Sequence, residues 1–362
     1  MKSYLKKTQT PGIHRGRGRL VTIMVLLSLC MIAIISYEQL SGPGTSSTVI
    51  RLHDDQIDIQ KFNNEIALFI IEKGYGYQVE KVESTIKEVH SRILDGDIDI
   101  TLEMWRENNI VWYEKAIASG DVLDLGSLYA SGQQFWIIPK WFAKENNIKT
   151  VFDMKHQWRK LLDPEDPSKG LFFNCIFGWN CRDINKIKLK AYGLDRFFNT
   201  VSPSSPEALR AIYENALEMH IPVFGYYWQP NALMATDQWY ILKEPAYDAT
   251  IWYQINQAAG MNEGLSIKTA CAYGDNSVLK IVHKNLLKKA PDIAQMFRKM
   301  SVDIDIIEDI LFQSKAPQPD FKAAARIFLL QYGSQWHGWV TPKAREKIIR
   351  ALDEPMPQPS TD

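Results

Sequence analysis

The chain has 362 residues, enough for two domains with well-buried cores. Its 42 basic and 42 acidic residues balance, but six of the basic residues and none of the acidic ones fall in the first 37 positions. The remainder therefore carries 36 basic against 42 acidic residues, a net charge of −6. This balance argues against a surface for nucleic acid, and we expect no nucleic-acid partner.

A basic segment, 1–19, precedes an uncharged apolar run, 20–36. The run is near the lower limit for a membrane-spanning helix, and its basic flank is expected to stay in the cytoplasm. We therefore expect the rest of the chain to be exported, with 20–36 as an inner-membrane anchor or, less favoured, a cleaved signal peptide. Lipidation at Cys30 is disfavoured, because Leu29 stands where a small residue is needed. Residues 37–48 are predicted to be a flexible linker.

Beyond the linker, predicted strands at 49–52, 77–82 and 98–102 alternate with predicted helices at 58–73 and 85–94. This alternation is typical of a parallel sheet covered by helices on both faces. Further along the chain we expect extended segments at 123–128, 133–139, 170–173, 222–230 and 240–244, a helix start near 150, and helices at 183–191, 206–219, 276–289 and 291–299. A segment at 302–312 and an amphipathic stretch at 321–352 close the chain.

Three tryptophans stand at the ends of predicted strands. Trp105 follows the strand at 98–102, Trp179 follows the strand at 170–173, and Trp228 ends the strand at 222–230. In open α/β sheets, ligands bind at the carboxyl ends of the strands. A single tryptophan at a strand end is more often part of the core than of a binding site. We also expect Trp112, with Tyr113 on the next helix, to be part of the core. Three tryptophans at strand ends together favour a shared aromatic cage.

Two cysteines, Cys175 and Cys181, bracket Trp179 in the segment expected to be exported, where disulfides persist. A disulfide is favoured over a free pair or half of a metal site, since no second pair of cysteines or histidines stands at zinc-ligand spacing. So small a loop would stabilise the fold by only about 2 kcal/mol, so its effect would be mainly local. Cys271 is expected to be buried and inert.

A helix is predicted to begin at about Asp183, directly behind the bracket. The free N–H groups of a helix start attract a carboxylate or phosphate, here through amides of Gly178, Asn180, Cys181 and Arg182. A methylammonium group gains about 0.5–2 kcal/mol from each aromatic face. The implied ligand has a trimethylammonium head and a carboxylate tail.

The chain resembles the glycine betaine/proline betaine-binding proteins of osmoprotectant ABC transporters. The resemblance rests on residues 96–105, 175–181, 222–230 and 338–340, and spans about 49–350. It implies an α/β, two-lobed periplasmic-binding-protein fold of type II, with each lobe a mainly parallel sheet flanked by helices. One lobe would comprise 49–139 and 245–352 and the other 140–244, with a disordered tail at 353–362.

By motif position, the resemblance implies an aromatic box of Trp105, Trp179 and Trp228, with the carboxylate held by the amides of Asn180 and Cys181. Relatives have a histidine four residues after the first tryptophan, whereas this chain has Asn109. An amide can donate a hydrogen bond but cannot become charged, so we expect weaker binding or a ligand without a carboxylate, unless Arg182 compensates. The expected ligands are glycine betaine, proline betaine, choline or carnitine.

The sequence lacks a phosphate-binding loop, so a separate ATPase and a membrane permease are the expected partners, with no cofactor. An enzyme acting on a quaternary amine is disfavoured, because neither Gly-x-Ser-x-Gly nor His-Glu-x-x-His occurs. His53 with Asp54 and Asp55 is the best remaining cluster, and we expect it in a turn or lining the cleft. The other alternative is a membrane-tethered sensor or accessory protein that binds choline- or carnitine-like ligands without transport.

Overall fold

The computed structural model describes residues 48–55, 57–260, 267–313 and 320–355, without the side chains of 311–313. The predicted basic segment, membrane helix and nearly all of the linker lie outside these residues, as does most of the predicted tail. Within the described residues, no helix is both long and apolar enough to cross a membrane.

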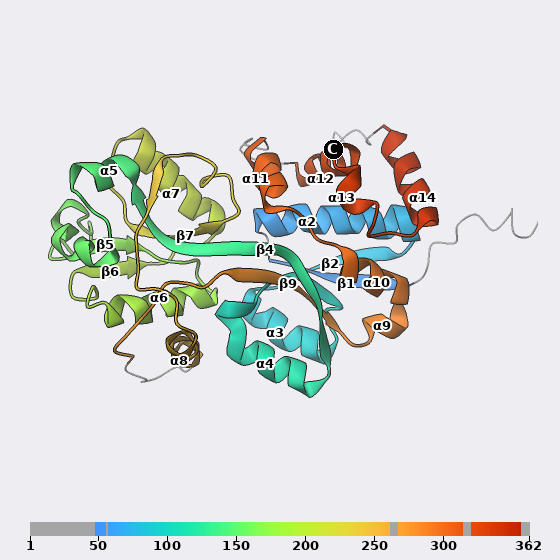
Figure 1. The fold of residues 1–362 in the computed structure, drawn as a ribbon, viewed down its shortest axis with the longest axis horizontal. Helices are drawn as coiled ribbons and strands as arrows, with labels where there is room; N and C mark the ends of the chain where they lie inside the picture. The colour runs from blue at the N-terminus through green and yellow to red at the C-terminus, as the bar shows by residue number, and fades with distance from the viewer. Residues whose placement is uncertain (1–47, 56, 261–266, 314–319, 356–362) are drawn as a thin grey trace, which may run out of the picture. The chain divides into compact units, whose positions relative to one another are not determined.

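A mixed sheet of nine strands runs through the described chain in the order β2-β1-β3-β9-β4-β7-β5-β6, with β8 paired to β4 (Figure 1). The strands are β1 (Val49–Asp54), β2 (Gln78–Glu83), β3 (Ile100–Trp105), β4 (Val122–Pro139), β5 (Gly170–Phe173), β6 (Phe198–Val201), β7 (Gly225–Gln229), β8 (Trp239–Ile241) and β9 (Asn276–His283). The long β4 joins the two halves of the sheet, because its first part pairs with β9 and its last part with β7 and β8.

Each half of the sheet contains both parallel and antiparallel pairs. In the first half, β1 is parallel to β2 and β3, whereas β9 is antiparallel to β3 and β4. In the second half, β5 is parallel to β6 and β7, whereas β4 is antiparallel to β7. The expected mainly parallel sheets are therefore mixed, because β4 and β9 run antiparallel to their neighbours. The predicted lobe boundaries stay a prediction.

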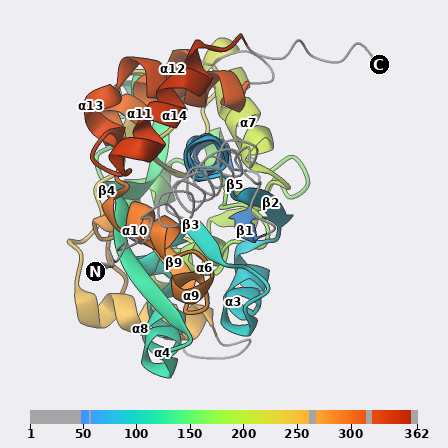
Figure 2. The ribbon, with the colours of Figure 1, turned by 90° about the vertical axis from the view of Figure 1, so that its right-hand side faces the viewer.

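Helices cover both faces of the first half. They are α2 (Asp58–Phe69), the π-helix η1 (Ile70–Tyr75), α3 (Ile86–Asp95), α4 (Ile110–Ser119), α9 (Leu286–Lys289), α10 (Pro291–Lys299), α11 (Ile304–Gln313), α12 (Phe321–Gln331), α13 (Gly333–Trp336) and α14 (Pro342–Asp353). On one face α12 packs on α2 and α14 on η1 (Figures 1 and 2). Gly74 permits this approach, since a Cβ there would lie 2.9 Å from Ile348 Cδ1. On the other face α3 and α4 bury Val89, Ile93 and Ala116.

The second half carries α5 (Lys140–Glu145), the 3₁₀ turns η3 (Val151–His156) and η4 (Trp158–Lys160), α6 (Asn180–Ala191), α7 (Pro206–Glu218) and α8 (Ala249–Ala259). Trp136 of β4 is fully buried in its core and donates to Asn185 Oδ1 of α6 at 2.8 Å. The first half keeps one further 3₁₀ turn, η2 (Arg106–Asn109), directly after β3. This turn and the start of α6 belong to different halves, and both border the site described below.

Most predicted elements are confirmed, but the helix expected at 276–289 is wrong. Residues 276–283 form β9, between β3 and β4, and only the short α9 is helical. The extended segments at 123–128 and 133–139 are one strand, β4. The helix expected from about Asp183 begins earlier, at Asn180, and α5 and α8 were not predicted.

Candidate functional site

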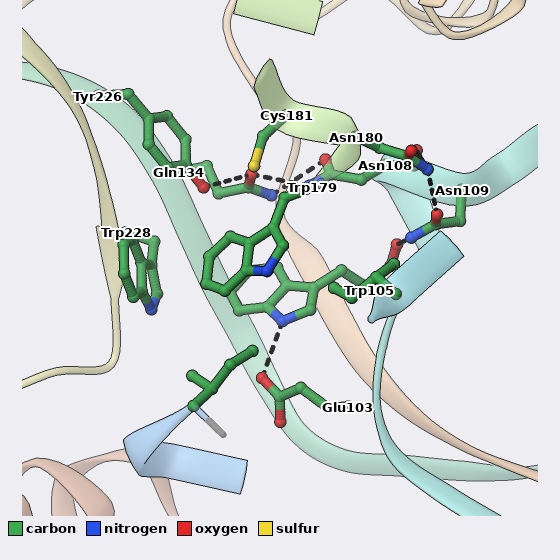
Figure 3. Close-up of a pocket in the computed structure, with 12 residues that line it drawn as sticks. Glu103, Trp105, Asn108, Asn109, Gln134, Trp179, Asn180, Cys181, Tyr226 and Trp228 are labelled. Carbon is green, nitrogen blue, oxygen red and sulfur yellow. Dashed lines mark hydrogen bonds between the residues drawn. The ribbon is translucent and has the colours of Figure 1, made fainter. Parts of the chain in front are cut away.

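A narrow cavity lies where the ends of β3, β7 and α6 meet (Figure 3). All six residues expected to bind ligand line it. The complete lining is Ile57, Ile86, Glu103, Trp105, Asn108, Asn109, Gln134, Trp179, Asn180, Cys181, Tyr226 and Trp228. Its free volume is ≈ 20 Å³, little more than the space of one water molecule. A larger ligand therefore requires the walls to move apart.

The three tryptophans reach the cavity from three separate elements. Trp105 is the last residue of β3, Trp179 immediately precedes α6, and Trp228 lies near the end of β7. The rings of Trp179 and Trp228 meet edge to face, with centroids 5.4 Å apart, and Tyr226 stacks on Trp228 at 6.1 Å. The cavity thus has aromatic walls from both halves of the sheet.

Trp105 is held in one orientation by its neighbours. Its Nε1 donates to Glu103 Oε1 at 2.8 Å, and the same oxygen accepts from the Tyr129 hydroxyl at 2.9 Å. Gly132 makes room for the ring, because a Cβ there would lie 3.0 Å from the indole carbons. The indole face is therefore presented to the cavity by contacts that do not involve a ligand.

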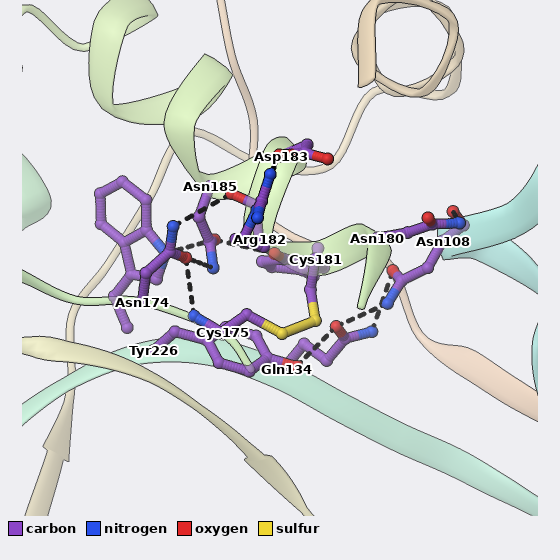
Figure 4. Close-up of a disulfide and its surroundings, with 12 residues drawn as sticks. Asn108, Gln134, Asn174, Cys175, Asn180, Cys181, Arg182, Asp183, Asn185 and Tyr226 are labelled. Atoms are coloured by element: carbon purple, nitrogen blue, oxygen red, sulfur yellow. Dashed lines mark hydrogen bonds and ion pairs between the residues drawn. A yellow bond between two sulfur atoms is a disulfide. The ribbon is translucent and has the colours of Figure 1, made fainter. Parts of the chain in front are cut away.

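The disulfide between Cys175 and Cys181 is present, with Cα atoms 5.7 Å apart (Figure 4). It closes a turn in which Gly178 has φ +93°, a value that favours glycine. Buried Asn174 ties this turn to α6, since its Oδ1 accepts from Cys175 N at 2.7 Å and from Asn185 Nδ2 at 3.0 Å. The disulfide and these hydrogen bonds thus hold both ends of the loop that carries Trp179.

The start of α6 presents backbone N–H groups beside the cage. Asn180 and Cys181 occupy its first turn, and the side chain of the N-cap residue, Trp179, forms no capping hydrogen bond. Such a helix start attracts negative charge. Both residues line the cavity, and their binding of an anionic group stays a prediction.

Both polar atoms of the Asn109 side chain have partners within the protein. Its Nδ2 donates to Trp105 O at 2.8 Å, and its Oδ1 accepts from Asn180 Nδ2 at 2.5 Å. The neighbouring Asn108 forms two amide hydrogen bonds with Gln134, at 2.8 and 3.1 Å. These bonds join η2 to α6 and β4, so they hold the two halves together beside the cage.

Two carboxyl groups beside the tryptophans titrate far above the usual acidic range. Burial raises the pKa of Glu103 to about 7, although hydrogen bonds from Trp105 and Tyr129 oppose the shift. Burial and the charge of Glu103 raise the pKa of Asp55 to about 8, and a hydrogen bond from the Trp179 side chain lowers it. Both groups lack a neutralising cation among the ion pairs of the described chain.

The other candidates have structural partners. Arg182 bonds to Asp183 through Nε and Nη2, both at 3.0 Å, and lies over the Phe177 ring. His53 is buried and bonded to Thr101 and to Ser84 O, both at 2.9 Å. No metal-binding group of histidine, cysteine and acidic residues occurs in the described part of the chain. Cys271 is fully buried, as expected.

Six lining residues were not predicted: Ile57, Ile86, Glu103, Asn108, Gln134 and Tyr226. Two of them carried a signal in the sequence. Glu103 and Tyr226 stand two residues before Trp105 and Trp228, and side chains at this spacing share one face of a strand. Gln134 lies opposite Trp228 in the pairing of β4 with β7, a register that strand patterns alone do not give.

Comparison with known proteins identifies the family. Residues 50–331 match the substrate-binding domain of ABC-type glycine betaine transport systems. The chain belongs to this family. The sequence-based resemblance is therefore confirmed, and the general role of the chain is to bind the substrate of an ABC-type transport system.

Solved structures share the fold of this glycine betaine-system binding domain. The glycine/betaine/L-proline-binding protein ProX from Borrelia burgdorferi has a TM-score of 0.67 at 17% identity, covering 83% of this chain and 99% of that protein. The lactococcal OpuAC complexed with glycine betaine has a TM-score of 0.63 at 14% identity, covering 82% of this chain and 100% of that protein. An ABC-transporter choline-binding protein in complex with choline has a TM-score of 0.66 at 17% identity, covering 84% of this chain and 98% of that protein. The predicted type II periplasmic-binding fold is confirmed.

Proposed function

We propose that the chain is the extracytoplasmic substrate-binding component of an ABC transporter and binds a quaternary ammonium compound between Trp105, Trp179 and Trp228. Glycine betaine, proline betaine, choline and carnitine all present the required head group. The chain then passes its ligand to a separate permease driven by an ATPase. Residues 20–36 hold it at the outer face of the inner membrane.

The observation that carries this proposal is the meeting of three indoles from different elements at one cavity. Aromatic faces attract quaternary ammonium groups by about 0.5–2 kcal/mol each, more when water is excluded. With hydrogen bonds to a polar tail, three faces approach the roughly 8 kcal/mol of micromolar binding. The start of α6 supplies amides for a carboxylate tail, where the ligand has one.

The test is calorimetric titration of the purified full-length chain, in a non-ionic detergent, with the four compounds. We expect saturable binding of at least one and, for Trp179→Ala, a loss of about tenfold or more in affinity. Trp158→Ala is the matched control, because Trp158 is also half-buried but lies in η4, outside the cavity lining. Absence of heat with all four compounds, or equal affinity in Trp179→Ala, would contradict the proposal.

A further inference from the structure

Glu103 is a carboxyl group that lines the cavity and has only half of its hydrogen-bonding capacity used. Glu103 is only 4% exposed, and its Oε1 accepts hydrogen bonds from the side chains of Trp105 and Tyr129. The other oxygen, Oε2, is buried without a hydrogen-bond partner in the described ranges. Such a group must either keep its proton or gain a cation, because an unpaired buried charge is costly.

Three other buried carboxylates of this chain have cations. Glu65 pairs with Lys81, Glu244 with Lys188, and Asp99 with Lys289 at 2.6 Å. Glu103 forms no ion pair within the described residues. Buried Asp163 also forms no ion pair there, but both of its oxygens accept hydrogen bonds, from Glu165 N and Asn199 Nδ2. In the same part of the chain, Glu103 has neither a cation nor a partner for Oε2.

The charged groups that act around Glu103 are acidic. Asp55, just after β1, couples electrostatically to Glu103, and Asp55 in turn feels the charges of Asp54 and of Glu88 on α3. From β3 and β4, Trp105 and Tyr129 contribute only hydrogen-bond donors. The histidines nearby, His53 and His90, have pKa values of about 4 because of burial, and remain neutral above pH 5.5. The described residues around Glu103 therefore supply no positive charge. A cationic ligand could supply it.

We propose that Glu103 is the counter-ion of the ligand's cationic head, and that it ionises when the head enters the cage and releases its proton to solvent. This inference rests on the proposed function. In the balanced step, neutral Glu103 and a quaternary ammonium ion become a Glu103 carboxylate, the bound cation and one free proton. Affinity then rises with pH, and the site discriminates between a cation and a neutral molecule of the same shape.

The first test uses the unmodified full-length chain and choline, whose quaternary nitrogen does not titrate. Titrations at pH 7 in two buffers with different ionisation enthalpies measure the protons released. We expect release of a substantial fraction of a proton per choline, and an affinity that rises by up to about tenfold per pH unit between pH 5.5 and 7. Equal heats in both buffers, with an affinity independent of pH, would overturn the proposal.

The second test uses Glu103→Gln, which keeps an oxygen for Trp105 and Tyr129 but cannot ionise. At pH 8 we expect choline binding to weaken about ten- to a hundredfold, while its neutral isostere 3,3-dimethyl-1-butanol binds no worse. Glu65→Gln, whose carboxylate is already paired with Lys81, should keep the pH dependence. Proton release and choline affinity that persist in Glu103→Gln would refute the role of Glu103.

A third variant separates this electrostatic role from packing. Tyr129→Phe removes a hydrogen bond that favours the ionised carboxylate, so the pH midpoint of choline binding should move upward. An unmoved midpoint would count against the proposal even if Glu103→Gln failed to fold. If the unmodified chain bound no quaternary amine at all, the proposed function itself would fail. Binding with no effect of Glu103 would overturn only this inference.

Discussion

Asn180 Nδ2 donates to Asn109 Oδ1 across 2.5 Å, and this bond joins the first turn of α6 to the turn after Trp105. Asn109 also donates to Trp105 O at 2.8 Å. Both ends of its amide are thus engaged within the protein. One of the two N–H groups of Asn109 Nδ2 is thus used and Oδ1 cannot donate, so we expect the backbone amides of Asn180 and Cys181 to be the main seat of a ligand carboxylate.

Asn180→Ala removes this bond but keeps the backbone amide. Because one neutral hydrogen bond contributes about 1 kcal/mol, we expect glycine betaine and choline to bind about fivefold more weakly, and to a similar extent, by calorimetry. Asn199→Ala is the control, since Asn199 bonds to Asp163 and Asp166 and does not line the cavity. A loss confined to glycine betaine would instead assign the Asn180 side chain to the carboxylate.

The disulfide is expected to matter more for binding than for stability. Replacing both Cys175 and Cys181 by serine opens only a short loop. We therefore expect the free energy of unfolding to fall by about 2 kcal/mol and the Tm by roughly 4 °C. Ligand affinity should fall at least tenfold, because Trp179 would lose its fixed position. Calorimetric Tm and Kd measured on one preparation check this, with Cys271→Ala as the control outside the loop. An unchanged Kd would contradict it.

The wrong prediction for 276–289 has a physical cause. The strand β9 is buried along nearly its whole length between β3 and β4, and its apolar run of Val278, Leu279, Ile281 and Val282 is interrupted only by the buried Lys280. Such a run lacks the alternation of a half-exposed strand and cannot be told from a buried helix by periodicity alone. The edge strand β2, its neighbour β1 and the capped α3, by contrast, were predictable from local patterns.

The meeting of the three tryptophans at one cavity could be predicted, and its polar surroundings could not. Trp105, Trp179 and Trp228 follow from one rule about strand ends, together with the cysteine bracket. The amide pair of Asn108 and Gln134 depends on how η2 meets β4 in three dimensions. The strand pattern put Glu103 beside Trp105, but only the fold shows its second oxygen to be buried.

Glu103 should also make stability fall with pH. Its pKa is about 7 in the folded chain, against an ordinary value near 4.3 for the unfolded chain. The folded state therefore keeps a proton that the unfolded state loses, and stability declines as pH rises from about 4.5 to 7. Glu103→Gln lacks this decline.

The measurement is the Tm of Glu103→Gln minus that of the unmodified chain at several pH values. We expect a difference near zero at pH 4 and a more stable variant at pH 8, by up to about 3 kcal/mol in the free energy of unfolding. Saturating choline should shrink the gain at pH 8 by stabilising the ionised carboxylate. A Tm difference that does not depend on pH would refute the assigned titration.

A buried ion pair lies between α6 and the segment after β8. Lys188 Nζ is 2.8 Å from Glu244 Oε2, both side chains are almost fully buried, and the ammonium lies 4.0 Å from the Tyr273 ring centroid. Glu244→Gln leaves Lys188 without its counter-charge and should cost about 3–5 kcal/mol in urea unfolding. The double variant Lys188→Met with Glu244→Leu should recover most of this loss. A double variant as unstable as the single one would contradict the prediction.

A crystal structure of the chain with glycine betaine or choline tests the aromatic cage most directly. The account predicts the quaternary nitrogen within about 6 Å of the ring centroids of Trp105, Trp179 and Trp228, with the last two rings no longer in contact. A ligand bound elsewhere, with the Trp179 and Trp228 rings still meeting at their present 5.4 Å, would contradict it.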